Sequence, residues 1–221
     1  MFTNPPMLLA AAGHAGTNFL SVLTISLILT VVLIVCHFVW TMARPNRPGP
    51  RRRWGIWESL VYIGALGCVL LLALTSFGAM ARFGAIGGWS LFVHMVGAGM
   101  FTTVLPVIAL TWAAAHWCCC GCRCKTEKKE CCADGDKAEG DAEDSEPKPV
   151  GHFFWLAKLC FWTILAAGWV VTMTMLISML PIFGTDGLNT LLDVHRYAGL
   201  IVVVALILHL YAVILRCIGL R

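Results

Sequence analysis

The sequence predicts an all-α integral membrane protein, a bundle of five transmembrane helices with its N-terminus outside and its C-terminus in the cytoplasm. Three observations predict this class. First, 59% of the 221 residues are hydrophobic and only 13% are charged, whereas a soluble domain is about 25% charged. Second, five apolar stretches are long enough to cross a bilayer as helices. Third, the basic residues are spread unevenly over the segments that join these stretches.

The five spans divide the chain in order. An outer lead is expected at residues 1–17 and an additional N-terminal span at 18–42. The second and third spans occupy residues 54–117. Residues 118–152 form a cytoplasmic loop, rich in cysteine at first and in charge later, and its charged composition predicts partial disorder. The fourth and fifth spans follow within residues 153–221, the fourth at about 153–180 and the fifth from Asp193 to Arg216. The partly amphipathic segment PIFGTDGLNTLLD between them is expected to be a connector.

The basic residues predict the orientation. Fourteen of the 16 lysines and arginines lie on one side of the expected bundle. They are Arg44, Arg47, Arg51, Arg52, Arg53, Arg123, Lys125, Lys128, Lys129, Lys137, Lys148, Lys158, Arg216 and Arg221. Only Arg82 and Arg196 lie on the other side. The excess of basic residues marks the cytoplasmic side, so the net charge of +4 reflects topology and does not indicate nucleic-acid binding. We expect a multi-pass protein of a bacterial inner (cytoplasmic) membrane.

The fifth span carries two histidines, His195 and His209, in an otherwise apolar run. An ionisable residue inside a membrane is costly and is a functional-site hypothesis by default. At about 100° and about 1.5 Å per residue, the two imidazoles point to nearly the same side of the helix and lie ~21 Å apart along it. Two stacked haems, each bound by one of these histidines, explain the spacing. The alternative is one histidine at the interface and an unrelated one in a helix contact.

The membrane histidines sort by depth into two pairs. His94 and His195 lie at the outer ends of their spans, and His37 and His209 lie toward the inner side. Two bis-histidine haems need such an arrangement, with the histidines as axial ligands of the iron. His116 is a rival to His37 as the inner ligand, but it lies ~33 Å below His94 on its helix and is therefore too deep unless that helix tilts strongly.

Arginines accompany the outer histidines. Arg82 and Arg196 are the only basic residues on that side, and guanidinium groups suit the carboxylates of haem propionates. Ordinary interfacial arginines are the alternative interpretation. On the inner side, Arg53 and Arg216 are candidates for the same role.

Residues 177–214, ISMLPIFGTDGLNTLLDVHRYAGLIVVVALILHLYAVI, resemble the last two helices of the di-haem cytochrome b (gamma) subunit of membrane-bound formate dehydrogenases. Hydrogenase b-type cytochromes are more distant relatives of that family. In the family the final helix bears two haem histidines fourteen residues apart, as His195 and His209 are here. His94, in SLFVHMVGAG, matches a further outer ligand. A nitrate-reductase-type gamma subunit resembles this chain less, because its histidine spacings differ.

One departure from the family concerns the inner haem. The family's first helix opens with an Arg-x-x-His-Trp motif that supplies the inner ligand, but the stretch RRRWGIWESLVYIG at residues 51–64 contains no histidine. Either the inner haem is lost, or the additional N-terminal helix supplies His37 in its place.

The resemblance implies a membrane-anchoring electron-transfer subunit, without a catalytic domain of its own. It implies two haem b groups, an iron–sulfur or cytochrome c partner subunit at the outer face, and a quinone near the cytoplasmic side as acceptor or donor. Glu58 and His116 are candidates for proton delivery to that quinone.

The cysteines of residues 118–132 remain open to two interpretations. Seven cysteines lie there, and cytoplasmic disulfides are not expected. Their thiolates can bind zinc, copper or an iron–sulfur cluster, yet the spacing matches no standard pattern, and a mobile tract beside the membrane is the alternative.

The rival function is a non-haem membrane anchor or a small transporter whose histidines bind a metal or relay protons. A transporter would show internal repeats or interrupted helices with charged residues at the membrane midplane. The sequence shows neither feature.

Overall fold

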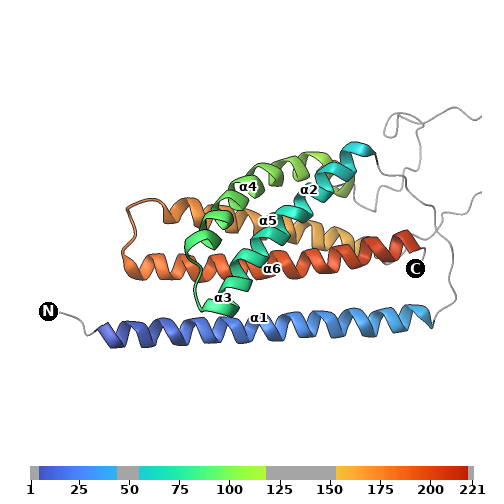
Figure 1. Ribbon diagram of the computed structural model, residues 1–221. Coiled ribbons are helices and arrows are strands. Elements are labelled where there is room, and N and C mark those ends of the chain that lie inside the picture. Colours follow the sequence, from blue (N-terminus) through green and yellow to red (C-terminus); the bar gives the residue numbers. More distant parts are fainter. Residues whose placement is uncertain (1–4, 44–54, 118–152, 219–221) are drawn as a thin grey trace, which may run out of the picture.

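The protein is a bundle of long helices (Figure 1). The computed structural model describes residues 5–43, 55–117 and 153–218, and the regular structure within these ranges is entirely helical. The elements are α1 (Pro5–Met42), α2 (Ile56–Ala73), η1 (Leu74–Gly78), α3 (Ala79–Phe83), α4 (Gly88–Trp117), α5 (Phe153–Ser178) and α6 (Thr185–Ile218). Because α2, the π-helical turn η1 and α3 are continuous, they form a single span.

Five helices in the described ranges are long and apolar enough to cross a membrane. They cover Asn18–Met42, Ile56–Phe83, Gly88–Trp112, Trp155–Ser178 and Thr185–Leu215. Large apolar side chains cover their outer faces, including Leu110, which is 84% exposed, and Ile25, which is 65% exposed. Such a surface suits lipid rather than water. The predicted all-helical, multi-pass membrane architecture is therefore confirmed.

The core lies where α2, α4, α5 and α6 meet. Its buried members are Cys68, Val69, Phe101, Leu105, Phe161, Leu165, Ala167 and Val202. Small residues allow the closest approaches, as is usual between membrane helices. At Gly168 on α5, an added Cβ would lie 2.9 Å from Cδ1 of Leu105 and 3.2 Å from Cζ of Phe101. A side chain at this position would therefore displace Leu105 at the contact between α4 and α5.

Helix α1 lies along one side of this four-helix group, next to α6 (Figure 1). Phe19, only 2% exposed, and Leu23 pack with Leu200 of α6 in a second, smaller core. The ring of Phe19 also contacts the rings of Phe77 in η1 and Tyr197 in α6, at centroid distances of 6.0 and 5.4 Å. The apolar span of α1, Asn18–Met42, is thus anchored near its start by an aromatic side chain that contacts both η1 and α6.

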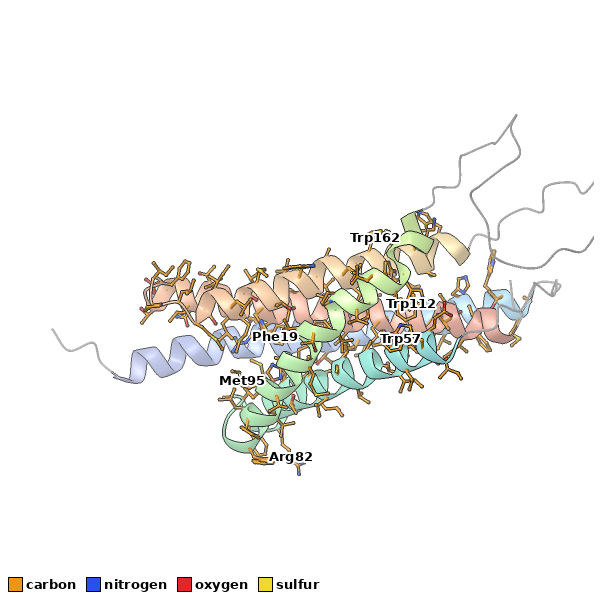
Figure 2. All side chains as sticks on the ribbon, turned by 90° about the horizontal axis from the view of Figure 1, so that it is seen from above. Phe19, Trp57, Arg82, Met95, Trp112 and Trp162 are labelled. Carbon is orange, nitrogen blue, oxygen red and sulfur yellow. The ribbon has the colours of Figure 1, made fainter. Side chains whose placement is uncertain are left out.

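The two ends of the bundle can be told apart by labelled residues in Figure 2, in which Arg82 and Met95 lie toward one end and Trp57, Trp112 and Trp162 toward the other. We refer to these as the Arg82 end and the Trp57 end. Helix α6 begins at Thr185, ahead of the expected start of the span at Asp193. The segment expected to be a connector is therefore largely the first turns of α6.

We predict that Gly168→Val destabilises the bundle, because the new side chain overlaps Leu105 and Phe101. Overpacking of this kind costs about 1–3 kcal/mol. Gly64→Val is the matched control, since a Cβ at Gly64 meets nothing within 4 Å. Thermal unfolding in detergent should show a lower midpoint for Gly168→Val than for Gly64→Val. Equal midpoints would contradict the packing described here.

Candidate functional site

His94 of α4 and His195 of α6 meet inside the bundle. Their ring centroids are 6.5 Å apart and their planes are inclined at 71°. Both side chains are half-buried. Two imidazoles that share one metal ion, each through a nitrogen–metal bond of about 2 Å, place their centroids roughly 6 Å apart. The structure thus brings together the two histidines predicted to share the outer haem, at a separation that suits one metal ion between them.

A threonine of the neighbouring helix contacts the ring of His94. Thr75 Oγ1 lies 3.1 Å from Nδ1 of His94 and donates its own proton to the carbonyl of Leu71 at 2.7 Å. A hydroxyl has only one proton to donate. The oxygen of Thr75 therefore accepts a hydrogen bond from Nδ1–H of His94, which leaves the lone pair of Nε2 for another partner.

His195 is held in the same way from α5. Thr174 Oγ1 lies 3.1 Å from Nδ1 of His195 and donates to the carbonyls of Val170 and Val171, each at 2.9 Å. The carbonyl oxygen of Val171 also lies 3.2 Å from Nδ1. A carbonyl only accepts, so Nδ1 of His195 carries the proton. Histidines that bind metals are typically oriented by such a bond from the other ring nitrogen.

A cavity of about 230 Å³ adjoins the two histidines. Four helices form its walls, and Leu72, Phe77, Phe101 and Val202 are among its many apolar lining residues. The cavity is smaller than the pockets of about 300–1,000 Å³ that usually hold small ligands. Its walls are adaptable, however, because Met95, Met175 and Met179 line it and methionine side chains are flexible.

Two glycines enlarge the space on the cavity walls. Gly99 of α4 and Gly199 of α6 both line the cavity, and a Cβ added at either would meet no atom within 4 Å. Gly199 lies one turn from His195 on the same helix face. The open space beside these glycines can admit a flat group that extends sideways from a metal ion between the histidines.

The two outer arginines differ in their relation to this site. Arg196 lines the cavity and makes a 3.4 Å ion pair with Asp193, one turn earlier on α6. Arg82 is exposed at the Arg82 end of the bundle and is not among the residues that line the cavity (Figure 2). Of the two, Arg196 is therefore the one placed to meet an anionic group at the cavity's edge.

The predicted inner histidines contact tyrosines. Nδ1 of His37 lies 2.7 Å from the hydroxyl of Tyr211, and the two rings meet edge to face. His209 packs on the ring of Tyr62 in α2, with centroids 6.1 Å apart. Residues 209 and 211 leave α6 in directions about 160° apart. The contacts of His209 with Tyr62 and of Tyr211 with His37 therefore lie on different sides of α6. The pairing of His37 with His209 stays a prediction.

Other predicted residues lie elsewhere or outside the description. Glu58 accepts a hydrogen bond from the backbone N–H of Gly55 at 3.2 Å, so it caps the start of α2. The side chains of His116 and Arg216 lie outside the described residues, as do Arg53 and the cysteines of residues 118–132.

The sequence reasoning missed the threonines and the cavity glycines. Thr75 is the one threonine of the second span, and Thr174 shares the fourth span with Thr163 and Thr172. Nothing in the local sequence relates either residue to a histidine. Gly199 could have been found from the sequence, since a glycine one turn from a membrane histidine provides room beside the imidazole. Gly99 lies close to His94 in the segment SLFVHMVGAG and had the same kind of signal.

Comparison of the chain with protein-family models, with curated proteins and with solved structures finds no match. Within the described ranges, no three His, Cys, Asp or Glu side chains are grouped so that they could hold a metal ion. A haem with two axial histidines needs only two protein ligands, because the porphyrin supplies the others.

We predict that Tyr211→Phe weakens the attachment of α1, because it removes the hydroxyl that bonds to His37. Interhelical hydrogen bonds in membranes contribute about 0.6 kcal/mol on average. Tyr197→Phe is the control, since the ring of Tyr197 keeps its contact with Phe19. Unfolding in detergent should show a loss for Tyr211→Phe and none for Tyr197→Phe. The opposite order would contradict the assignment.

Proposed function

We propose that this chain is a membrane-anchoring b-type cytochrome subunit. It moves electrons between a partner redox subunit at the outer face and a quinone near the cytoplasmic side. The observation that carries the proposal is the pair His94 and His195, with ring centroids 6.5 Å apart and both Nδ1 atoms engaged. The fourteen-residue spacing of His195 and His209, shared with formate dehydrogenase gamma subunits, supports it.

The residues at the cavity fit a haem b. Nε2 of His94 and of His195 would be the axial ligands, and Gly99 and Gly199 leave room for the edge of the porphyrin. A porphyrin is larger than the present cavity of about 230 Å³, so the methionines on its walls would rotate outward. Arg196 would meet a propionate at the cavity edge. Haem iron, when bound there, supplies a one-electron redox couple.

The chain's own contribution is to position the ligands and to exclude water. Apolar side chains cover most of the cavity wall, and a dry shell around a metal site controls solvent access and thereby its potential. The hydrogen bonds from Nδ1 to Thr75 and Thr174 make both imidazoles better donors toward a metal ion. The subunit would act with a catalytic partner rather than as a stand-alone enzyme.

The membrane orientation is part of the proposal. With fourteen of the 16 basic residues on the cytoplasmic side, the Arg82 end faces outward and receives the partner subunit. The membrane would be the bacterial inner membrane. A second haem would use His209 on the inner side, with His37 or His116 as its other ligand, and a quinone would react close to it.

Visible spectroscopy of the purified protein tests the proposal. Protein from haem-replete cells, reduced with dithionite, should show the sharp alpha band of a low-spin b haem. His94→Ala and His195→Ala should each abolish the outer haem, because either change removes an axial ligand. A flat visible spectrum would exclude the cytochrome function and favour a non-haem anchor or transporter. Unchanged haem content in both variants would show that His94 and His195 are not the ligands of the outer haem.

Haem content also decides the inner site. We predict that the wild-type protein binds two haems and that His209→Ala binds one. If His37 is the second inner ligand, His37→Ala also binds one haem and His116→Ala binds two. The reverse result would assign the site to His116. A wild-type protein with a single haem, unchanged by His209→Ala, would show that the inner haem of the family has been lost.

A further inference from the structure

The span that faces His94 is not a regular α-helix. Residues Leu74–Gly78 form a π-helical turn, η1, between α2 and α3. Such turns are rare, occur mostly as single turns inside α-helices, and are frequent at functional sites. This turn contains Thr75, which contacts His94, and Ser76 and Phe77, which line the cavity.

The turn changes the hydrogen bonding of one carbonyl group. In a regular α-helix the N–H of Ala79 would bond to the carbonyl of Thr75. Here it donates to the carbonyl of Ser76 instead. The hydroxyl of Ser90, in the first turn of α4, donates to the carbonyl of Thr75 at 2.9 Å. The carbonyl of Thr75 is therefore bonded to the neighbouring helix α4.

Ser90 and His94 are four residues apart, so they lie one above the other on the same face of α4. Thr75 contacts both of them. Its carbonyl accepts from Ser90, and its hydroxyl accepts from Nδ1–H of His94 at 3.1 Å. A single residue of the π turn thus fixes the first turn of α4 and the imidazole one turn further on.

The double contact lies within the π turn. The N–H of Ala79, which would bond to the Thr75 carbonyl in a regular α-helix, donates to Ser76 instead, so this bond does not compete with the one from Ser90. His195 has no comparable arrangement, because Thr174 lies within α5, a continuous α-helix from Phe153 to Ser178. The two histidines are therefore held by different backbone structures.

We propose that the π turn of Leu74–Gly78 is a positioning device for His94, in which Thr75 and Ser90 are positioning residues. Together they fix the Nδ1–H tautomer and the ring plane of His94, so that Nε2 faces the cavity. The identity of the ligand of Nε2 rests on the proposed function, whereas the tautomer and orientation of His94 do not.

Two measurements test this inference. The first needs no haem: nitrogen NMR of histidine-labelled protein reports which ring nitrogen of His94 carries the proton. The second is haem titration of the haem-free protein, with electron paramagnetic resonance of the ferric form, which is sensitive to the relative orientation of the two axial ring planes.

Thr75→Val removes the hydroxyl and keeps the shape of the side chain, and Thr75→Ser restores the hydroxyl. We expect Thr75→Val to lose the uniform Nδ1–H tautomer at His94 and to bind haem about 10–100-fold more weakly, as is typical when a bond to a ligating histidine is removed. The electron paramagnetic resonance spectrum of its ferric haem-bound form should shift as well. Thr75→Ser should match the wild type in the tautomer of His94, the haem affinity and the paramagnetic resonance spectrum.

Thr111→Val is the matched control. Thr111 is half-buried on α4, is not among the residues that line the cavity, and donates its hydroxyl proton to the carbonyl of Val107 at 2.7 Å, as Thr75 does to Leu71. The substitution should leave the His94 tautomer and the haem affinity unchanged. Should Thr75→Val fail to fold, Ser90→Ala decides the question, because it removes only the bond to the Thr75 carbonyl. This substitution should shift the nitrogen NMR signals of the His94 ring.

Two outcomes would overturn the inference. One is a Thr75→Val protein with the wild-type tautomer of His94. The other, if that variant fails to fold, is a Ser90→Ala protein with unchanged His94 signals. If no variant and no wild-type protein binds haem, the proposed function fails, while the NMR result still decides whether the π turn positions His94.

Discussion

The absence of water in a bilayer governs this structure, because every polar group at membrane depth must find its partner within the protein. His94 and His195 meet this constraint through threonines whose own protons are used by helix carbonyls. The imidazoles are therefore held by bonds that end in the backbone of α2 and α5. Any shift between the two helices of a pair would break these bonds, so the position of the histidines and the packing of the bundle depend on one another.

The same constraint explains what the sequence revealed and what it did not. The five spans follow from composition alone, because a run of apolar residues in lipid has no alternative to a helix. Depth along each helix follows from residue number, and depth alone placed His94 beside His195. Rotation of a helix about its axis does not follow from depth. His37 matches His209 in depth, yet the described contacts direct His37 to Tyr211 and His209 to Tyr62.

The π turn shows a second limit. The residues of η1, Leu74 to Gly78, are ordinary members of an apolar span, and no local pattern marks where the helix departs from regular α-helical bonding. Its position becomes visible only when Ser90, on another helix, is seen to donate to Thr75. The start of α6 at Thr185 was missed for a related reason: the segment before Asp193 is amphipathic and polar enough to suggest a connector, but it continues the helix.

The two helix pairs around the cavity follow one plan. In each pair the first helix supplies a threonine and the second a histidine: Thr75 with His94, and Thr174 with His195. Each hairpin therefore positions its own histidine from its own preceding helix. The pair of imidazoles is completed only when the two hairpins pack against one another.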